Sequence, residues 1–118
     1  LGLTGSFLPE GDLLNPYPCI RCADIYVQPS HYEAYPFAVT EAKILCRPIV
    51  ATRVGGMVSQ LQDGVTGRIV PVSAEALASA VGELIDCPDA AARFAENLKK
   101  TSADGMGDLD PYRRTVFA

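Results

Sequence analysis

The sequence predicts an α/β fold, a Rossmann-like parallel sheet with helices on both faces. Strand-like and helix-like segments alternate along the chain, and the strand-like ones, such as 24–28 and 49–52, are short and apolar. The segments 37–46 and 74–86 instead repeat their apolar residues at helical spacing. Short buried strands separated by helices are typical of parallel sheets, because the connecting helices cover the faces of the sheet.

The first half of the chain contains two predicted strand and helix pairs. Residues 4–8 form a short apolar strand, and a helix over 13–23 follows a turn-rich stretch. The next strand covers 24–28, and the next helix covers 37–46. Pro48 follows that helix, and a proline just beyond a helical pattern marks its end.

The second half continues the alternation. Residues 49–52 are rich in β-branched side chains and read as a buried strand. Gly55 and Gly56 follow at its carboxyl end, where a backbone without side chains can approach a ligand, although a tight turn is the alternative. A short helix over 58–62 and a last strand over 67–71 are expected next.

Two longer helices are predicted towards the end of the chain. Ser73 is expected to cap a long amphipathic helix over 74–86, and a second helix covers 90–100. Residues 101–118 are expected to form a linker and a terminal helix over 111–117. Three or four short strands are about half of a six-stranded dinucleotide-binding sheet, so the chain is expected to be part of a larger protein.

Composition and charge narrow the functional classes. The chain has 118 residues, 48% of them hydrophobic, which suits one packed domain. Its net charge is −4, and its ten Lys and Arg residues are scattered, so nucleic acid is not expected as a partner. The sequence shows no apolar run long enough to span a bilayer and no basic flank of a signal peptide, and a cytoplasmic location is therefore expected.

The four cysteines do not indicate redox or metal chemistry. Cys19 and Cys22 form a Cys-x-x-Cys pair, but it lies inside a predicted helix, and no second well-spaced pair accompanies it. Cys46 and Cys87 are isolated. All four are expected to be buried free thiols, and no metal site is predicted.

Two acids, Glu33 and Glu41, carry the main functional signal. They are eight positions apart and follow the strand at 24–28, which gives the order strand, loop acid, helix start, helix acid. In open α/β sheets a ligand binds beyond the carboxyl ends of the strands, so both carboxylates are expected to face one molecule. The amides that open the helix between them suit a phosphate. Hydroxyl-binding carboxylates beside phosphate-binding amides suggest a nucleotide sugar.

Two neighbouring residues are assigned smaller roles. His31 is the only histidine, and no carboxylate or serine is spaced to make it a general base, so a rim or packing role is expected. Ser30 is expected to cap backbone amides rather than act as a nucleophile.

A set of short motifs in a fixed order resembles the second half of the donor-binding domain in retaining glycosyltransferases of family four, also called group one. The similarity runs from about residue 3 to residue 85 and includes Gly5-Ser6-Phe7, Ala23-Asp24-Ile25-Tyr26-Val27, Pro29-Ser30, Glu33, Glu41-Ala42, Pro48-Ile49-Val50-Ala51-Thr52, Val54-Gly55-Gly56, Asp63-Gly64 and Gly67 to Pro71.

This resemblance implies an architecture and a reaction. It implies two facing Rossmann domains of the GT-B type, with residues 1–100 as the C-terminal portion of the nucleotide-sugar-binding domain. The reaction would be metal-independent transfer of a sugar from a nucleotide diphosphate donor, with retention at the anomeric carbon. Segments 15–18 and 41–46 look most like members that build bacterial surface polysaccharides. The acceptor, a glycan or a lipid-linked sugar, would bind a missing N-terminal domain, which could also attach the protein peripherally to the inner membrane.

The resemblance also implies roles for individual residues. Glu33 would be the catalytic residue, contacting the hydroxyls of the donor sugar and the face where positive charge develops, and Glu41 would bind the ribose hydroxyls. The remaining donor-binding residues would be the loop residues Tyr35 and Pro36, Phe37 and Ala38 through amides at the pyrophosphate, Phe7 and Leu8 along the base, and Gly55 and Gly56 close to the donor.

Departures from the family pattern keep alternatives open. Ala34 and Cys46 replace family glycines, and Ser59 replaces a family acid. The basic residues that neutralise the diphosphate in the family would lie before Leu1, so the chain alone is expected to be inactive. The alternatives are a non-catalytic nucleotide-recognition or assembly module and a double-Rossmann sugar-nucleotide epimerase.

Overall fold

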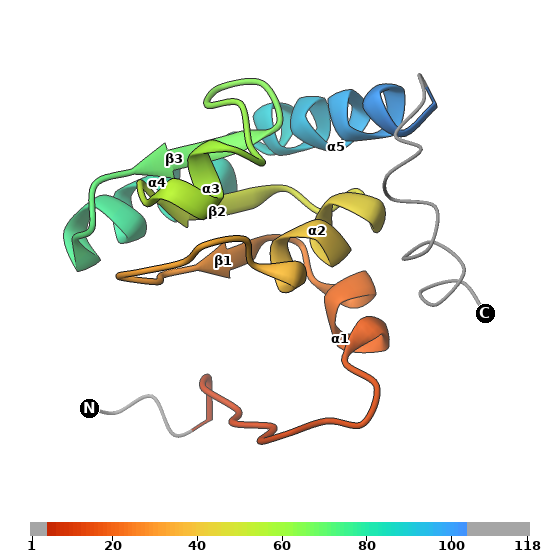
Figure 1. Ribbon diagram of the computed structural model, residues 1–118, viewed down its shortest axis with the longest axis vertical. Helices are drawn as coiled ribbons and strands as arrows, with labels where there is room; N and C mark the ends of the chain where they lie inside the picture. The colour runs from red at the N-terminus through yellow and green to blue at the C-terminus, as the bar shows by residue number, and fades with distance from the viewer. Residues whose placement is uncertain (1–4, 104–118) are drawn as a thin grey trace.

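The computed structural model describes residues 5–103 of the chain, and its elements alternate between helix and strand until two helices follow one another at the end (Figure 1). In chain order they are α1 (Tyr17–Cys22), β1 (Tyr26–Gln28), α2 (Phe37–Ile44), β2 (Ile49–Thr52), α3 (Gly55–Val58), β3 (Gly67–Val70), α4 (Ala74–Asp86) and α5 (Pro88–Ala103).

The three strands form one parallel sheet with β2 in the middle. Val27 of β1 lies opposite Val50 of β2, which in turn lies opposite Arg68 of β3. Every residue of β2 is buried, as expected for a central strand covered on both faces. Because all three strands run the same way, their carboxyl ends meet at one edge of the sheet.

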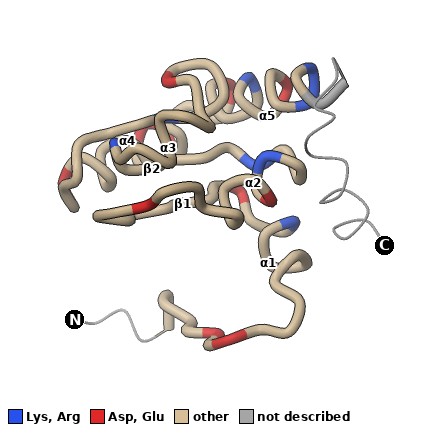
Figure 2. The backbone as a smooth tube through the Cα atoms, viewed as in Figure 1, with Lys and Arg blue, Asp and Glu red and all other residues tan. Residues whose placement is uncertain are grey.

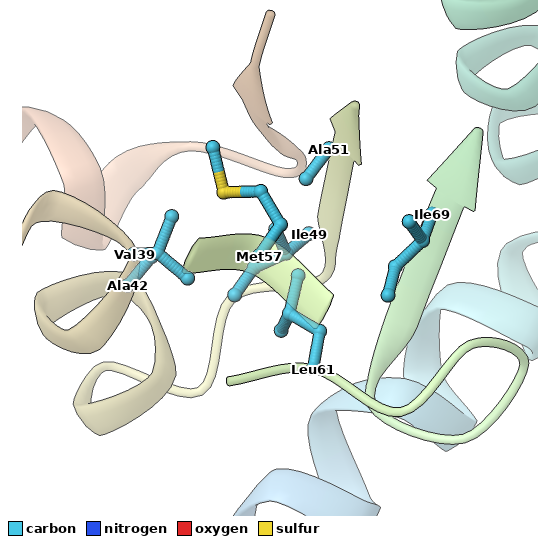
Figure 3. Close-up of a cluster of buried hydrophobic side chains, with 7 residues drawn as sticks. All are labelled: Val39, Ala42, Ile49, Ala51, Met57, Leu61 and Ile69. Atoms are coloured by element: carbon cyan, nitrogen blue, oxygen red, sulfur yellow. The ribbon is translucent and has the colours of Figure 1, made fainter. Parts of the chain in front are cut away.

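Alternate residues of β2 serve two separate cores. On one face, side chains of the sheet pack against α2, α3 and the residues just after α3, and Met57 lies between helix and sheet (Figure 3). This cluster consists of Val39, Ala42, Ile49, Ala51, Met57, Leu61 and Ile69. On the other face, Val50 packs against α4 and α5, in a cluster with Val70, Ala80, Leu84 and Phe94. The expected α/β fold with helices on both faces is therefore confirmed.

The most local predictions agree with the structure. Strand 49–52 and helix 74–86 have the bounds that the sequence predicts. Ser73 caps the helix as expected, because its Oγ accepts a hydrogen bond from the Ala76 amide at 3.2 Å. The next helix is longer than 90–100 at both ends, since α5 covers Pro88–Ala103 and so includes the first residues of the expected linker. The helix predicted over 111–117 lies outside the described residues.

Other predictions were wrong in their bounds or their nature. Residues 5 and 6 form a turn and 7–10 have no regular structure, so the described part of the expected 4–8 strand is absent. A strand needs a partner for its backbone hydrogen bonds, and nothing in the described chain pairs with this segment. The helix expected over 13–23 begins only at Tyr17. Proline is tolerated in the first turn of a helix but not in its interior, so prolines at 16 and 18 require the helix to begin beside them. The helix expected over 58–62 lies earlier, at Gly55–Val58.

The cysteines are free but not buried. Cys19, Cys22 and Cys87 are exposed, and Cys46 is half-buried. The first two lie on α1, a short helix that packs through its other residues, Tyr17 and Ile20, against the end of α2. None of the described helices is both long and apolar enough to cross a membrane.

Candidate functional site

The loop between β1 and α2 carries Glu33 and is packed tightly against α3. The Gly56 amide donates a hydrogen bond to the Glu33 carbonyl at 2.9 Å. A Cβ at position 56 would lie 2.7 Å from the Ala34 carbonyl oxygen and 2.8 Å from the Glu33 carbonyl oxygen, which is too close for any side chain. Gly56 thus permits a close backbone approach, and the partner it approaches is the chain's own loop. Gly55 is exposed, with open space where its side chain would be.

The same loop is tied to the end of β2. Thr52 is fully buried, and its hydroxyl donates to the Ser30 carbonyl. Because β1 and β2 are also paired through Gln28 and Ala51, the first residues after β1 have little freedom.

The Glu33 carboxylate is held by two side chains from β1 and its loop. Ser30 Oγ donates to Glu33 Oε1 at 3.0 Å, and Gln28 Nε2 lies 3.4 Å from the same oxygen. Gln28 Nε2 also donates to Ser30 Oγ at 2.9 Å. The expectation that Ser30 caps backbone amides is wrong, because its hydroxyl is used by the neighbouring carboxylate. Tyr26 completes the chain by donating its hydroxyl to Gln28 Oε1 at 2.6 Å.

Glu41 lies one turn further into α2 and contacts α1. The Tyr17 hydroxyl donates to Glu41 Oε1 at 3.1 Å. Burial raises the pKa of Tyr17, and the hydrogen bond and the charge of Glu41 raise it further.

Tyr26 lies within electrostatic reach of both acids. Burial raises the pKa of Tyr26 first, and the charges of Glu41 and then Glu33 add to the shift. The Tyr26 phenol therefore lies near both carboxylates.

The first turn of α2 is held in place by hydrogen bonds to a buried side chain. Pro36 is the N-cap residue and offers no side-chain cap, and the first intrahelical hydrogen bond is the 3.5 Å contact from the Thr40 amide to the Pro36 carbonyl. The buried Gln60 clamps this turn, because its Nε2 donates to the same carbonyl at 3.1 Å and its Oε1 accepts from the Thr40 hydroxyl at 2.8 Å. The amides of Phe37 and Ala38 thus lie at a helix tip whose orientation is fixed by tertiary contacts.

Two aromatic rings flank this tip on the surface. Tyr35 and Phe37 meet edge to face, with ring centroids 6.4 Å apart. Both are exposed, Tyr35 by 47% and Phe37 by 58%, so they are open to contacts outside the described chain.

The structure brings most of the expected site residues to one edge of the sheet, but two of them lie elsewhere. Those at or next to the carboxyl ends of β1 and β2 are Glu33, Tyr35, Pro36, Phe37, Ala38, Glu41, Gly55 and Gly56. Phe7 and Leu8 are about 70% exposed, and the segment that carries them lies apart from the sheet and α2 (Figure 1). His31 is exposed and borders a cavity of about 350 Å³ near the start of α4, which is compatible with the expected rim role.

Sequence reasoning missed several residues of the site. Gln28 and Tyr26 stand two positions apart on β1, and polar groups at that spacing in an otherwise apolar strand were a usable signal. Gln60 and Thr52 gave no such signal, because their partners are twenty or more residues away in the chain.

The charges of the described residues form no basic stripe. Figure 2 shows the Lys and Arg residues of 5–103 spread over several separate elements. In the same part of the chain, no three His, Cys, Asp or Glu side chains come together in a way that could hold a metal ion.

Comparison with known proteins gives a consistent family. The family model described as Glycosyl transferases group 1 matches residues 7–101. A D-inositol 3-phosphate glycosyltransferase 2 from Catenulispora acidiphila is 35% identical over 103 residues, covering 81% of this chain and 24% of the relative. An alpha-D-kanosaminyltransferase from Streptomyces kanamyceticus is 37% identical over 95 residues, covering 75% of this chain and 25% of the relative.

A solved structure shows the same fold. Anabaena Alr3699/HepE, determined in complex with UDP-glucose, superposes with a TM-score of 0.70 over 83% of this chain and 27% of that protein, at 21% identity. This chain thus spans about a quarter of the length of the proteins it matches. The parallel sheet, the placement of the two acids and the family match over residues 7–101 lead to one conclusion: the chain belongs to the glycosyl transferases group 1 family.

Proposed function

We propose that this chain carries part of the donor site of a retaining glycosyltransferase that takes its sugar from a nucleotide diphosphate. In this proposal Glu33 binds the donor sugar, Glu41 binds the ribose hydroxyls, and the first amides of α2 hold the diphosphate. The observation that carries it is the Glu33 carboxylate, held by Ser30 and Gln28 at the carboxyl edge of the sheet beside the tip of α2.

The chemistry of this edge suits such a donor. The first amides of a helix have no intrahelical acceptor, and the helix dipole adds a partial positive charge, so phosphate oxygens are favoured there. Ionised carboxylates accept hydrogen bonds from sugar hydroxyls. A carboxylate beside the anomeric carbon also stabilises the positive charge that develops in glycosyl transfer.

The comparisons support the class of donor. The relatives are named as glycosyltransferases, and the Anabaena protein of the same fold was crystallised with UDP-glucose. We therefore propose a nucleotide sugar as the donor. Retention at the anomeric carbon and independence of metal ions remain predictions that rest on the family resemblance.

The acceptor proposed for the parent protein follows from two short segments of this chain. Segments 15–18 and 41–46 favour a glycan or lipid-linked acceptor in bacterial surface polysaccharide synthesis, with the acceptor bound outside this chain. One relative is instead named for inositol 3-phosphate, and the name of the other gives only the group transferred, a kanosaminyl group. Transfer assays of the parent protein should therefore include an inositol phosphate beside lipid-linked sugars.

The isolated chain is expected to bind a donor weakly and to transfer nothing. It covers about a quarter of its relatives, and the diphosphate contacts proposed within it are neutral amides. Each charge-assisted hydrogen bond supplied by other parts of the parent would add about 1.5–3 kcal/mol.

Nuclear magnetic resonance on the 118-residue chain tests donor binding directly. UDP, GDP, ADP and UDP-glucose are titrated to millimolar concentration, and shifts are expected at the amides of Phe37 and Ala38. Glu41→Gln should weaken binding of every nucleotide, whereas Glu96→Gln, an exposed site on α5, is the matched control. The absence of any shift near Glu33 and Glu41 would refute residual donor binding by this chain.

The parent protein tests the reaction. Sugar transfer or donor hydrolysis by the parent, lost in Glu33→Ala and kept in Glu96→Gln, is the expected result. Donor binding without transfer or hydrolysis would favour a non-catalytic nucleotide-recognition module, and interconversion of the donor sugar would favour an epimerase.

A further inference from the structure

We infer that Gln28 is a positioning residue for Glu33, and that Tyr26 supports it by holding the far end of the Gln28 amide. The inference rests on the proposed role of Glu33 at the donor sugar. It concerns what holds that carboxylate in place before any ligand arrives.

The base of the Gln28 side chain is rigid. Gln28 is the last residue of β1 and is paired with Ala51 of the fully buried central strand. Tyr26, two residues earlier, lies on the same face of the strand and packs against the core beneath α2. Both side chains therefore project from a fixed backbone towards the side of the sheet that carries α2.

Hydrogen-bond polarity decides the orientation of the amide. Tyr26 has a raised pKa, so its hydroxyl keeps its proton at neutral pH, and it donates that proton to Gln28 Oε1 at 2.6 Å. At the other end, an ionised Glu33 can only accept. A flipped Gln28 amide would set its carbonyl oxygen against the Glu33 carboxylate, whereas the Tyr26 hydroxyl can donate or accept. Glu33 thus requires the NH₂ group to face Ser30 and Glu33, and Tyr26 holds the opposite end of the amide by donating to its oxygen.

The consequence is a carboxylate with one oxygen bound and the other available. Glu33 Oε1 receives the Ser30 hydroxyl at 3.0 Å and the Gln28 amide at 3.4 Å. Glu33 Oε2 has no hydrogen-bond partner among the described side chains or backbone groups of 5–103. Holding one oxygen removes rotamer freedom before the ligand binds, so less entropy is lost on binding.

If these polar side chains had no role in positioning Glu33, an apolar arrangement at the same place would be more favourable. Partly buried polar groups must be fully paired, and an apolar side chain at position 28 would fill the same space without that requirement. Here each donor in the chain from Tyr26 through Gln28 and Ser30 points onward to the next acceptor, and the chain ends at Glu33.

The test compares nucleotide with nucleotide sugar in the parent protein. Calorimetry measures the dissociation constants of UDP and UDP-glucose. If another base binds, its nucleoside diphosphate and the corresponding nucleotide sugar are used instead. Gln28→Met keeps the length of the side chain and removes its hydrogen bonds. This substitution should weaken the binding of UDP-glucose about three- to tenfold relative to the binding of UDP, as expected for one or two lost hydrogen bonds. Tyr26→Phe should act in the same direction and more weakly.

Matched variants separate positioning from general damage. Gln62→Met makes the same substitution at an exposed site outside the proposed donor site and should change neither constant. In a Glu33→Ala background, Gln28→Met should have no further effect on the ratio of the two constants. Equal weakening of UDP and UDP-glucose would show a purely structural role and overturn the inference.

The outcome also distinguishes this inference from the proposed function. If Glu33→Ala lowers the preference for UDP-glucose while Gln28→Met and Tyr26→Phe do not, the positioning role fails and the donor site stands. If Glu33→Ala leaves the preference unchanged, the proposed role of Glu33 itself fails. Should Gln28→Met not fold, Tyr26→Phe, which removes only one oxygen atom, decides the question by the same ratio.

Discussion

Replacing Gly56 with alanine should destabilise the chain by displacing the loop that carries Glu33. The added Cβ would lie 2.7 Å from the Ala34 carbonyl oxygen, 2.8 Å from the Glu33 carbonyl oxygen and 2.8 Å from Pro36 Cδ. Two of these contacts are with backbone, which cannot swing aside as the end of a long side chain can. The loop must therefore move away from α3 and stretch the 2.9 Å hydrogen bond between the Gly56 amide and Glu33.

The expected magnitude follows from three opposing effects. Overpacking of a tight site costs about 1–3 kcal/mol, and a weakened hydrogen bond adds up to about 1 kcal/mol. Alanine also favours a helix over glycine by about 0.5–1 kcal/mol, which offsets part of the loss. Gly56→Ala should thus lower the free energy of unfolding by about 1–3 kcal/mol.

Gly55 supplies the control for this experiment. It is the preceding residue, it lies in the same helical turn, and a Cβ there meets nothing within 4 Å. Gly55→Ala should leave stability unchanged or raise it by up to about 1 kcal/mol. Urea unfolding of both variants, followed by far-UV circular dichroism, gives the comparison. If Gly56→Ala is as stable as Gly55→Ala, the tight contact between α3 and the loop is refuted.

Three further substitutions probe the same framework. Gln60→Leu should cost about 1–3 kcal/mol in urea unfolding, because it leaves the buried Thr40 hydroxyl without its partner and removes one of the two hydrogen bonds to the Pro36 carbonyl, whereas Gln62→Leu at an exposed site should be neutral. Ser73→Ala should cost about 0.5–2 kcal/mol by removing the α4 cap, with the exposed mid-helix Ser79→Ala as its control. The raised pKa of Tyr26 means that the folded state keeps the phenol proton at pH values above the ordinary pKa of 10.0. The stability that Tyr26 contributes is therefore complete below that pH and is lost as the pH rises through the pKa of the folded state. Unfolding free energies measured across this alkaline range should therefore fall less steeply in Tyr26→Phe.

Each of these three predictions has a clear contrary result. Equal stabilities of the Gln60 and Gln62 variants would show that the clamp on the α2 tip contributes nothing. A Ser73 variant as stable as the Ser79 variant would remove the cap from the account of α4. An alkaline slope unchanged by Tyr26→Phe would show that folding does not raise the pKa of Tyr26.

The sequence by itself determined the parts of this protein that depend on local rules. The apolar run at 49–52 predicts a central strand, and the serine before 74–86 predicts where a long helix begins, since periodicity and capping act within a few residues. Glu33 and Glu41 could be placed at the same edge of the sheet because parallel strands present their carboxyl ends together. The family resemblance extended this to a donor site.

Only the tertiary structure decided how that edge is built. It showed that Gly56 makes room for the chain's own loop, that Gln60 holds the tip of α2, and that Gln28 reaches Glu33 through an amide whose oxygen is bound by Tyr26. It also showed that Phe7 does not lie in a strand. These features depend on hydrogen-bond geometry and on packing between segments distant along the chain, and neither quantity is written in local sequence periodicity.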